Sequence, residues 1–363
     1  MSHPYKSAPD RAFWKRAFSQ GWDKTWLTNG TSLINSGEKV ASAGSCFAAN
    51  IVPYLERSGI EYVRRGLLPH LFSETAQDNF NYSKFSAAYG NVYTARQAVQ
   101  LIARALGRFK PVEDRWECAA DTIVDPFRPG LKFPAVSHRE FGLLTAQHLA
   151  DVLEVVQSAD VFVFTLGLTE AWMSRVDGAV FPACPGTVAG SFNAANHIFH
   201  NFSSVEVARD LIDLVRLLRE VNSKLRLVLT VSPVPLVATA TDHHVLVANS
   251  YSKSALRVAA GEVERDCSNV TYFPAYEIVT GPQSGYDFFE NDRREPSRVA
   301  INAVMEAFLS KCEIGVRDAK SHVSPGRESF SDKRPVSSEE SQQATRISSL
   351  VAAAQCEEEA AGM

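Results

Sequence analysis

Apolar positions along the chain follow two patterns that alternate with one another. Several short runs are apolar at nearly every position, which is typical of strands buried on both faces of a sheet. These runs are Lys39–Ala43, Asp160–Leu166, Leu225–Val231 and Asn269–Phe273. Longer stretches between them have apolar residues at helical spacing, which predicts amphipathic helices. They are Ala48–Arg57, Tyr93–Phe109, Thr145–Gln157, Ser204–Asn222, Asn249–Asp266 and a last helix that opens at Pro296.

This alternation predicts an α/β fold, a three-layer α/β/α arrangement in which helices cover both faces of a mainly parallel sheet. The segments 67–93 and 115–138 fit neither pattern, and we expect them to be insertions near one end of the sheet. After about Cys312 the composition changes to serine and mixed charges, with too few apolar residues to offset the entropy of ordering. We therefore expect an N-terminal extension over 1–35, one folded domain over 36–312 and a disordered Ser-rich tail over 313–363.

Composition and charge exclude several classes of protein without indicating a chemistry. The 363 residues carry 37 Lys and Arg against 41 Asp and Glu, and this net charge of −4 gives no reason to expect nucleic acid as a partner. No apolar run is long enough to span a membrane, and the first residues lack the apolar core of a signal peptide. The six cysteines are scattered without zinc-binding spacing, and no phosphate-binding glycine motif occurs. We therefore expect a cytoplasmic protein with reduced thiols, no cofactor and no metal.

The candidate chemistry lies where the predicted strands end, because open α/β sheets bind ligands outside the carboxyl ends of their strands. Gly44-Ser45-Cys46 follows the first predicted strand. A serine at this turn exposes its hydroxyl beside the backbone N–H groups of the next helix, as a nucleophile requires. The alternative is an ordinary serine that caps the helix. Spacing alone favours neither interpretation.

The residues around Ser45 resemble a known family. Gly44-Ser45-Cys46-Phe47-Ala48 is the signature of the GSCFA family, a branch related to the SGNH/GDSL hydrolases. Further blocks resemble that family in the same order: Gly90–Arg96, Thr165–Trp172, Thr230–Leu236, Asn249–Lys253 and Val270–Glu277. The resemblance implies a flavodoxin-like SGNH-hydrolase fold. It also implies that Ser45 occupies the nucleophile position and that Gly167 and Glu170 belong to the third block of the SGNH pattern.

The last block departs from the SGNH pattern, in which an Asp and a His stand three residues apart before the final helix. Asp292 is present here, but Glu295 stands where the His is expected. A carboxylate is a poor base towards a serine hydroxyl unless burial raises its pKa. The alternative is that Asp292 and Glu295 only cap a helix whose first residue is Pro296.

Other residues could supply the base. His244 is the best placed of the remaining histidines because it lies near a matched block, and Asp292 would orient the base. Lys253 is a second candidate, since a Ser–Lys pair works when the amine is desolvated. The remaining histidines considered, each more typical of a structural or exposed side chain, are His70, His138, His197, His200 and His243.

The other candidate residues would bind the substrate or stabilise an oxyanion. Gly90 and Asn91 could donate to an oxyanion, and the alternative is a simple turn. Thr169 and Glu170 could orient substrate, or Thr169 could cap a following helix. Cys46, at a helix N-terminus, is an alternative nucleophile or a small buried residue.

Two functions therefore remain open. The first is an SGNH-like serine esterase or O-acyltransferase, which acts on a small-molecule or carbohydrate acyl ester through Ser45. The second is a non-catalytic binding module that retains the cleft, because Glu295 replaces the expected histidine. The sequence does not determine the oligomeric state.

Overall fold

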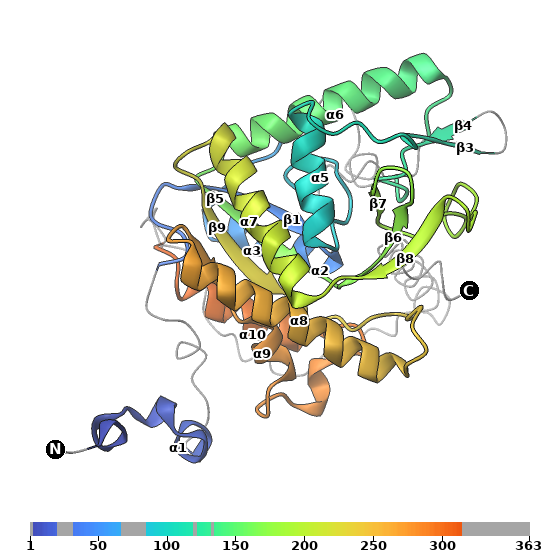
Figure 1. The fold of residues 1–363 in the computed structure, drawn as a ribbon. Helices are drawn as coiled ribbons and strands as arrows, with labels where there is room; N and C mark the ends of the chain where they lie inside the picture. The colour runs from blue at the N-terminus through green and yellow to red at the C-terminus, as the bar shows by residue number, and fades with distance from the viewer. Residues whose placement is uncertain (1–2, 20–31, 67–84, 119–121, 132–133, 314–363) are drawn as a thin grey trace, which may run out of the picture.

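The central sheet of the computed structural model has five parallel strands. The structure describes residues 3–19, 32–66, 85–118, 122–131 and 134–313. The sheet strands are β1 (Lys39–Gly44), β2 (Glu61–Tyr62), β5 (Val161–Leu166), β9 (Arg226–Val231) and β10 (Val270–Tyr272). Their spatial order is β10-β9-β5-β1-β2, and every adjacent pair is parallel (Figure 1). Numbered along the chain these strands run 2-1-3-4-5, which is the flavodoxin-like order. The predicted fold class is confirmed.

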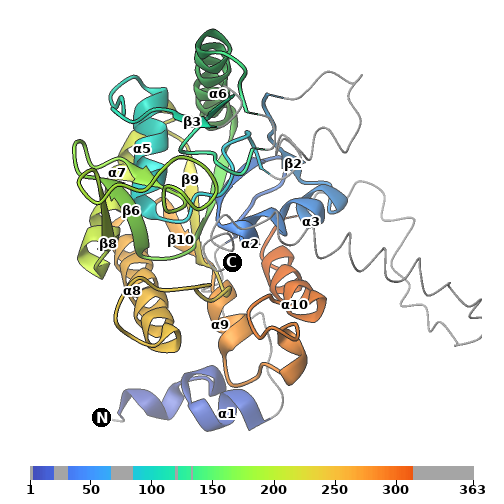
Figure 2. The same cartoon turned by 90° about the vertical axis from the view of Figure 1, so that its right-hand side faces the viewer.

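Helices cover both faces of this sheet and make it a three-layer structure (Figures 1 and 2). One face packs on α5 (Ala95–Ala105), α6 (His138–Ser158), α7 (Ser204–Val221) and α8 (Val245–Asp266). The opposite face packs on α2 (Cys46–Ala49), α3 (Val52–Arg57), α9 (Ala275–Thr280) and α10 (Arg298–Leu309). Alternate residues of β5 enter the two cores, with Phe162 and Phe164 on the first face and Val161 and Val163 on the second. Both faces are buried, as the continuous apolar runs predicted.

The predicted helix over Ala48–Arg57 is divided into two. α2 ends at Ala49, and α3 starts at Val52 with Pro53 in its first turn. Proline has no N–H and disfavours helical geometry at the residue before it, so a new helix begins there instead of a continuous one. The predicted helix over Thr145–Gln157 is longer than expected, because Ser137 accepts a hydrogen bond from the N–H of Glu140 and caps a helix that starts at His138.

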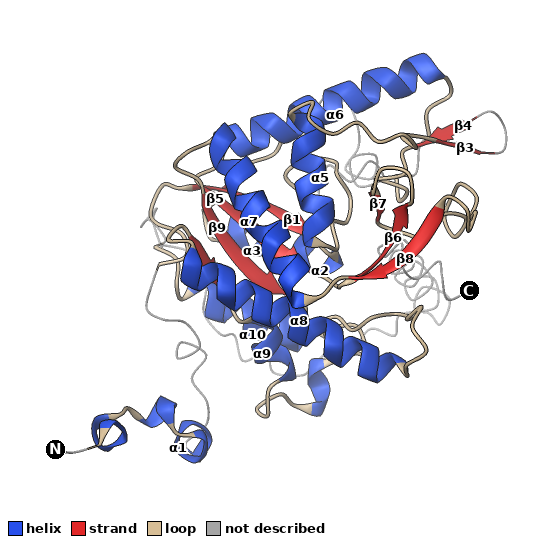
Figure 3. Ribbon diagram, viewed as in Figure 1, coloured by secondary structure: helices blue, strands red, loops and turns tan. Residues whose placement is uncertain are grey.

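Two small antiparallel sheets were not predicted. One joins β3 (Trp116–Cys118) to β4 (Thr122–Val124), inside the expected insertion 115–138. The other has the order β7-β6-β8 and contains β6 (Glu170–Ser174), β7 (Val180–Phe181) and β8 (His197–Asn201). Figure 3 shows this second sheet beyond the end of the central strands. Only Gly167–Thr169 separates β6 from β5, so the main sheet leads directly into it.

The chain before β1 contributes to the folded body. Leu33 and Ile34 are fully buried, and they pack in the same core cluster as α10. Leu33 donates a backbone hydrogen bond to Lys311, and Glu313 donates one to Ile34, both at 2.8 Å. We propose that the folded body starts at Ser32, a few residues before the expected boundary. Residues 3–19 form two short 3-10 helices, Pro4–Ser7 and Asp10–Ala12, and α1 (Trp14–Ser19). The predicted tail over 313–363 lies, after Glu313, outside the described residues.

Candidate active site

Ser45 lies in the turn between β1 and α2, and its hydroxyl has no partner among the described residues. Its side chain is buried, at 2% exposure. The residue occupies the N-cap position of α2, yet its Oγ accepts no hydrogen bond from that helix. Oγ is one of a few buried polar atoms that lack any hydrogen bond. The capping interpretation therefore does not describe this serine, and a buried hydroxyl left unpaired requires another explanation.

Two glycines allow the ends of β1 and β5 to approach each other closely around Ser45. Gly44 has φ +146°, and a Cβ there would lie 2.5 Å from the carbonyl oxygen of Thr165. A Cβ on Gly167 would lie 3.1 Å from the Cβ of Ser45. The Ser45 N–H in turn donates to Thr165 O at 3.2 Å. A side chain at either glycine would therefore move the turn that holds Ser45.

Lys253 reaches the same place from the middle of α8. It is 1% exposed, and its Nζ donates to the carbonyl oxygen of Gly167 at 2.5 Å. Gly167 packs directly against Ser45, so Lys253 and the candidate nucleophile both contact Gly167. Of the base candidates, Lys253 is the one whose described contacts lead to Ser45.

The segment 90–93 lies along the other side of the β1 end. Gly90 has φ +65°, which a glycine adopts without strain, and Asn91 is buried. The N–H of Val92 donates to Gly44 O at 2.8 Å, and Tyr93 O accepts the N–H of Gly167 at 2.9 Å. Gly90 and Asn91 are thus next to the turn that carries Ser45, as an oxyanion role requires.

Thr169 and Glu170 fix loops around the site. Thr169 N–H donates to Ser252 Oγ at 3.0 Å, and its hydroxyl donates to Asn201 Oδ1 at 2.6 Å. Both Glu170 oxygens are engaged, one by the Thr239 hydroxyl at 2.7 Å and one by the Ala240 N–H at 3.2 Å. The element that follows is the strand β6, so the expectation that Thr169 caps a helix is wrong.

The Asp292–Glu295 stretch forms a tight turn. Asp292 is exposed, and its Oδ1 accepts the N–H groups of Arg294 at 2.9 Å and Glu295 at 3.0 Å. Glu295 is half-buried and pairs with Arg294 at 3.1 Å. The final helix starts at Arg298 rather than at Pro296, because the Ser297 hydroxyl accepts the N–H of Ala300 and caps it. Asp292 and Glu295 therefore shape the approach to α10 but do not cap it.

The candidate histidines have other partners or lie in solvent. His244 is exposed and caps α8, with its Nδ1 accepting the N–H of Leu246 at 3.2 Å. His197 pairs with Glu113, and His200 with Glu206. His243 is exposed, and His138 lies near Glu117. His70 lies outside the described residues.

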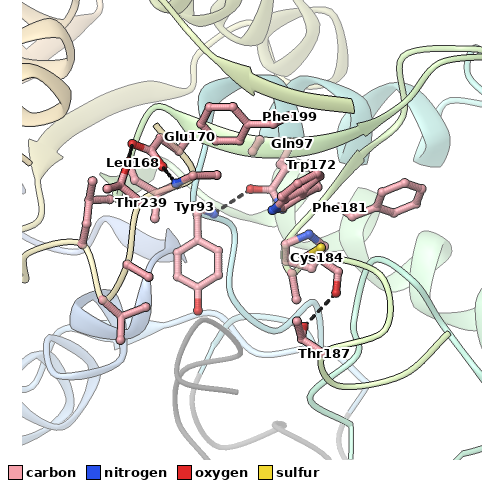
Figure 4. A pocket seen from close by; sticks show the side chains of 17 residues that line it. Tyr93, Gln97, Leu168, Glu170, Trp172, Phe181, Cys184, Thr187, Phe199 and Thr239 are labelled. Carbon is pink, nitrogen blue, oxygen red and sulfur yellow. Dashed lines mark hydrogen bonds between the residues drawn. The ribbon is translucent and has the colours of Figure 1, made fainter. Parts of the chain in front are cut away.

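A cavity of about 340 Å³ opens at the small antiparallel sheet (Figure 4), and Ser45 is not among the residues that line it. Tyr93 and Leu168, which flank the Gly167 contact, form part of its wall. The small antiparallel sheet and the loop after β9 supply the rest, chiefly Trp172, Phe181, Phe199, Leu236 and Ala238. These residues could not be predicted from the sequence, because their strands are too short to give a periodic signal.

Neither a metal site nor a membrane span is found in the described part of the chain. No group of three or more His, Cys, Asp or Glu side chains is placed to hold a metal ion among those residues. The described helices are all too short or too polar to cross a bilayer.

The comparisons with known proteins agree with this geometry at the level of the family. Residues 39–308 match the GSCFA family, and the chain belongs to that family. The family match extends from β1 to α10 and includes every candidate site residue. A search of the curated proteins finds no match.

Several solved structures resemble the chain at low identity. A family 3 carbohydrate esterase from Talaromyces cellulolyticus has 10% identity and a TM-score of 0.37, with 76% of this chain and 95% of that chain covered. A family 3 carbohydrate esterase from Clostridium thermocellum has 10% identity and a TM-score of 0.32, with 76% and 94% covered. An acetyl-xylooligosaccharide esterase from Geobacillus has 16% identity and a TM-score of 0.32, with 80% and 100% covered. Similarity at this level does not bear on activity.

We predict that Gly44→Ala destabilises the protein far more than Gly59→Ala. Both glycines have positive φ, but a Cβ at Gly59 meets nothing within 4 Å, whereas one at Gly44 overlaps Thr165. The strain and overlap at Gly44 are expected to lower the free energy of unfolding by about 3 kcal/mol or more, against about 1 kcal/mol at Gly59. Urea denaturation measures both, and equal losses would contradict the close approach of β1 and β5.

We predict that His244 contributes to stability as the cap of α8. His244→Ala removes the acceptor for the Leu246 N–H and is expected to cost about 0.5–2 kcal/mol. His244→Asn keeps an acceptor and is the matched control, with a smaller loss expected. Thermal and urea unfolding of the two variants give the comparison, and identical losses would exclude a capping role.

Proposed function

We propose that the protein is an SGNH-like serine esterase or O-acyltransferase in which Ser45 is the nucleophile. Its Oγ attacks the carbonyl carbon of an acyl ester, the ester C–O bond breaks, and the alcohol leaves with the proton. Water or a second hydroxyl compound then takes the acyl group from Ser45. The observation that carries this proposal is the buried Ser45 hydroxyl at the carboxyl end of β1, which is unpaired among the described residues. It packs against Gly167, whose neighbours Tyr93 and Leu168 line a cavity.

Two neighbouring threonine hydroxyls support a ligand-binding site at the end of the sheet where Ser45 lies. Thr165 and Thr230 are register partners near the ends of β5 and β9, and Thr165 is also the register partner of Gly44. Both threonine hydroxyls are buried, and neither has a hydrogen-bond partner within the described part of the chain. Buried polar groups are almost always satisfied, so unpaired hydroxyls gathered at one sheet end favour a place where water or a ligand binds. Open α/β sheets use this end for ligands.

We propose Lys253 as the base that accepts the Ser45 proton. It is buried and bonded to the carbonyl of Gly167, the residue that packs on Ser45. His244 is exposed and caps α8, and the Asp292 carboxylate accepts two backbone N–H groups of its own turn. A neutral amine can serve a serine as histidine does. The described contacts therefore favour a Ser–Lys pair over a triad built on Asp292.

Asn91 and its neighbours are our candidates for the oxyanion site. The 90–92 segment is fixed to the end of β1 through the Val92–Gly44 hydrogen bond. Donors held in advance beside the reacting carbonyl stabilise its developing negative charge without reorganisation. The amide of Asn91 is the polar side chain that this segment provides.

The lining of the larger cavity favours an apolar acyl group as the part of the substrate that binds in it. Its wall is mainly aromatic and aliphatic, and the Glu170 carboxylate in it is already bonded to Thr239 and Ala240. Its volume of about 340 Å³ is larger than an acetyl group requires. A carbohydrate as the alcohol part of the ester stays a prediction from the family resemblance.

One observation favours the second function, a binding module without catalysis. None of the described residues hydrogen-bonds to Ser45 Oγ, so no base is in contact with it in this structure. Catalytic hydrogen bonds are often long in structures without substrate, and labelling of the serine separates the two functions.

We predict that a fluorophosphonate probe labels the wild-type protein and that Ser45→Ala and Lys253→Met both abolish the labelling. An activated serine is required for the reaction, and both variants remove a partner of the proposed pair. Ser250→Ala is the control, because that exposed hydroxyl bonds only to a carbonyl of its own helix. Circular dichroism checks that each variant is folded. Wild-type protein that is not labelled supports the binding module, and labelling retained in Ser45→Ala excludes Ser45.

We predict that Ala238→Trp lowers kcat/KM for hexanoyl esters at least tenfold and leaves acetyl esters less affected. Ala238 is exposed at the wall of the cavity, so an indole there fills the cavity with little cost to folding. A tenfold loss corresponds to about 1.4 kcal/mol of transition-state binding. Ala238→Ser is the control of similar size. Equal losses for both esters would place the acyl group outside this cavity.

A further inference from the structure

A second, smaller cavity lies behind the 90–92 segment, between α5, α6 and β7. Figure 1 shows α5 beside both of the other elements, and residues of all three line the cavity. Its volume is about 20 Å³, enough for a single water-sized group by the usual estimate of roughly 10–15 Å³ per water. The residues that line it, from these elements, from the chain before α5 and from the chain after β4, include Asn91, Gln100, Arg104, Arg128 and His148.

Arg104 carries a buried charge that hydrogen-bonds to no carboxylate among the described residues. Asp125 and Asp114 are close enough to act on its pKa in the opposite direction, but burial outweighs them. Arg104 is 6% exposed, and its guanidinium stacks over the Phe127 ring with 4.0 Å between Cζ and the ring centroid. No described acceptor hydrogen-bonds to that guanidinium, although it has five N–H donors. Burial lowers the pKa of Arg104, which reflects the cost of holding this charge away from water.

The other charged groups near the cavity leave an excess of positive charge on its wall. Arg128 is equally buried and is paired with Asp125 at 2.8 Å, so that carboxylate is already used. Asp114 is bonded to Arg115, and Asp151 is bonded to Gln147 on α6. None of the described lining residues is a carboxylate. Two arginines therefore face this wall, and the carboxylates that act on Arg104, Asp125 and Asp114, lie outside the wall and are bonded to other arginines.

His148 adds an unpaired polar atom to the same wall. It is 4% exposed, and its Nδ1 has no hydrogen-bond partner within the described residues. Burial and the charges of Arg128 and Arg104 hold the pKa of His148 well below its usual range, so the ring is neutral at pH 7. A neutral imidazole carries one N–H that can donate to a bound group.

We propose that this cavity is a binding site for one halide-sized anion, chloride in practice, held by Arg104 with His148 and the side-chain amides of Gln97 and Gln100. A single chloride ion is small enough for this cavity and offsets the charge of the buried guanidinium. Asn91 and Val92 also line the cavity, and Val92 is bonded to Gly44. The bound anion thus supports, from behind, the segment that lies beside Ser45. The proposal does not depend on any catalytic activity.

The test compares salts at constant ionic strength on the full-length protein. We expect saturable stabilisation by sodium chloride and sodium bromide, with Tm rising by about 2 °C once the halide exceeds its Kd several-fold. Sodium gluconate and sodium sulfate should not reproduce it. Stabilisation by sulfate equal to that by chloride would be a general salt effect and would overturn the proposal, as would no response to halide.

Two further measurements make the assignment specific. Arg104→Met should abolish the halide response, while Arg108→Met should keep it, because Arg108 is an exposed partner of Glu220 and does not line the cavity. Crystals of the wild-type protein grown with bromide should show an anomalous peak between Arg104 and His148. This second measurement needs no variant, so it decides the question even if Arg104→Met fails to fold. A crystal without that peak at saturating bromide would exclude the site.

Discussion

The geometry of the candidate site depends on the close approach of β1 to β5 at Gly44. The register pairs Gly44 with Thr165, and the glycine adopts a φ of +146°. A Cβ at this position would overlap Thr165. Only a residue without a Cβ fits there. The Ser45 N–H then bonds back to Thr165 O, which turns the chain out of the sheet and into α2. The position of the candidate nucleophile is therefore set by a steric constraint one residue before it.

The same constraint brings distant parts of the chain together. Gly167 packs on Ser45, its carbonyl oxygen accepts a hydrogen bond from Lys253 Nζ, and its N–H donates to Tyr93 O. Residues from β1, β5, α8 and the segment before α5 thus converge on one point. Each contact is made at the carboxyl end of a parallel strand. The segments that follow neighbouring parallel strands all start at this edge of the sheet, so their residues lie close together there.

Unpaired buried polar atoms occur at both proposed sites, although not only there, since Thr145 and Asp210 also carry one among the described residues. In most of the protein, buried polar atoms are satisfied, as in the capping box of Ser203 and Glu206 at the start of α7. The exceptions include Ser45, Thr165 and Thr230 at the sheet end, and His148 at the small cavity. Desolvating such groups is unfavourable unless a ligand or water completes them. We therefore interpret these positions as places where something binds.

The sequence by itself determined the layered fold, the family and the turn that carries Ser45, because buried parallel strands and the glycine before Ser45 leave local patterns. It did not determine the short strands β6, β7 and β8, whose two to five residues are too few to show a period. Nor did it separate Lys253 from His244 or Glu295 as the base. Those residues differ in their surroundings, with Lys253 buried against Gly167, His244 capping a helix and Glu295 paired with Arg294. Burial and hydrogen-bond partners come from residues far away along the chain, so only the tertiary structure decided which of these side chains contacts the residue that packs on Ser45.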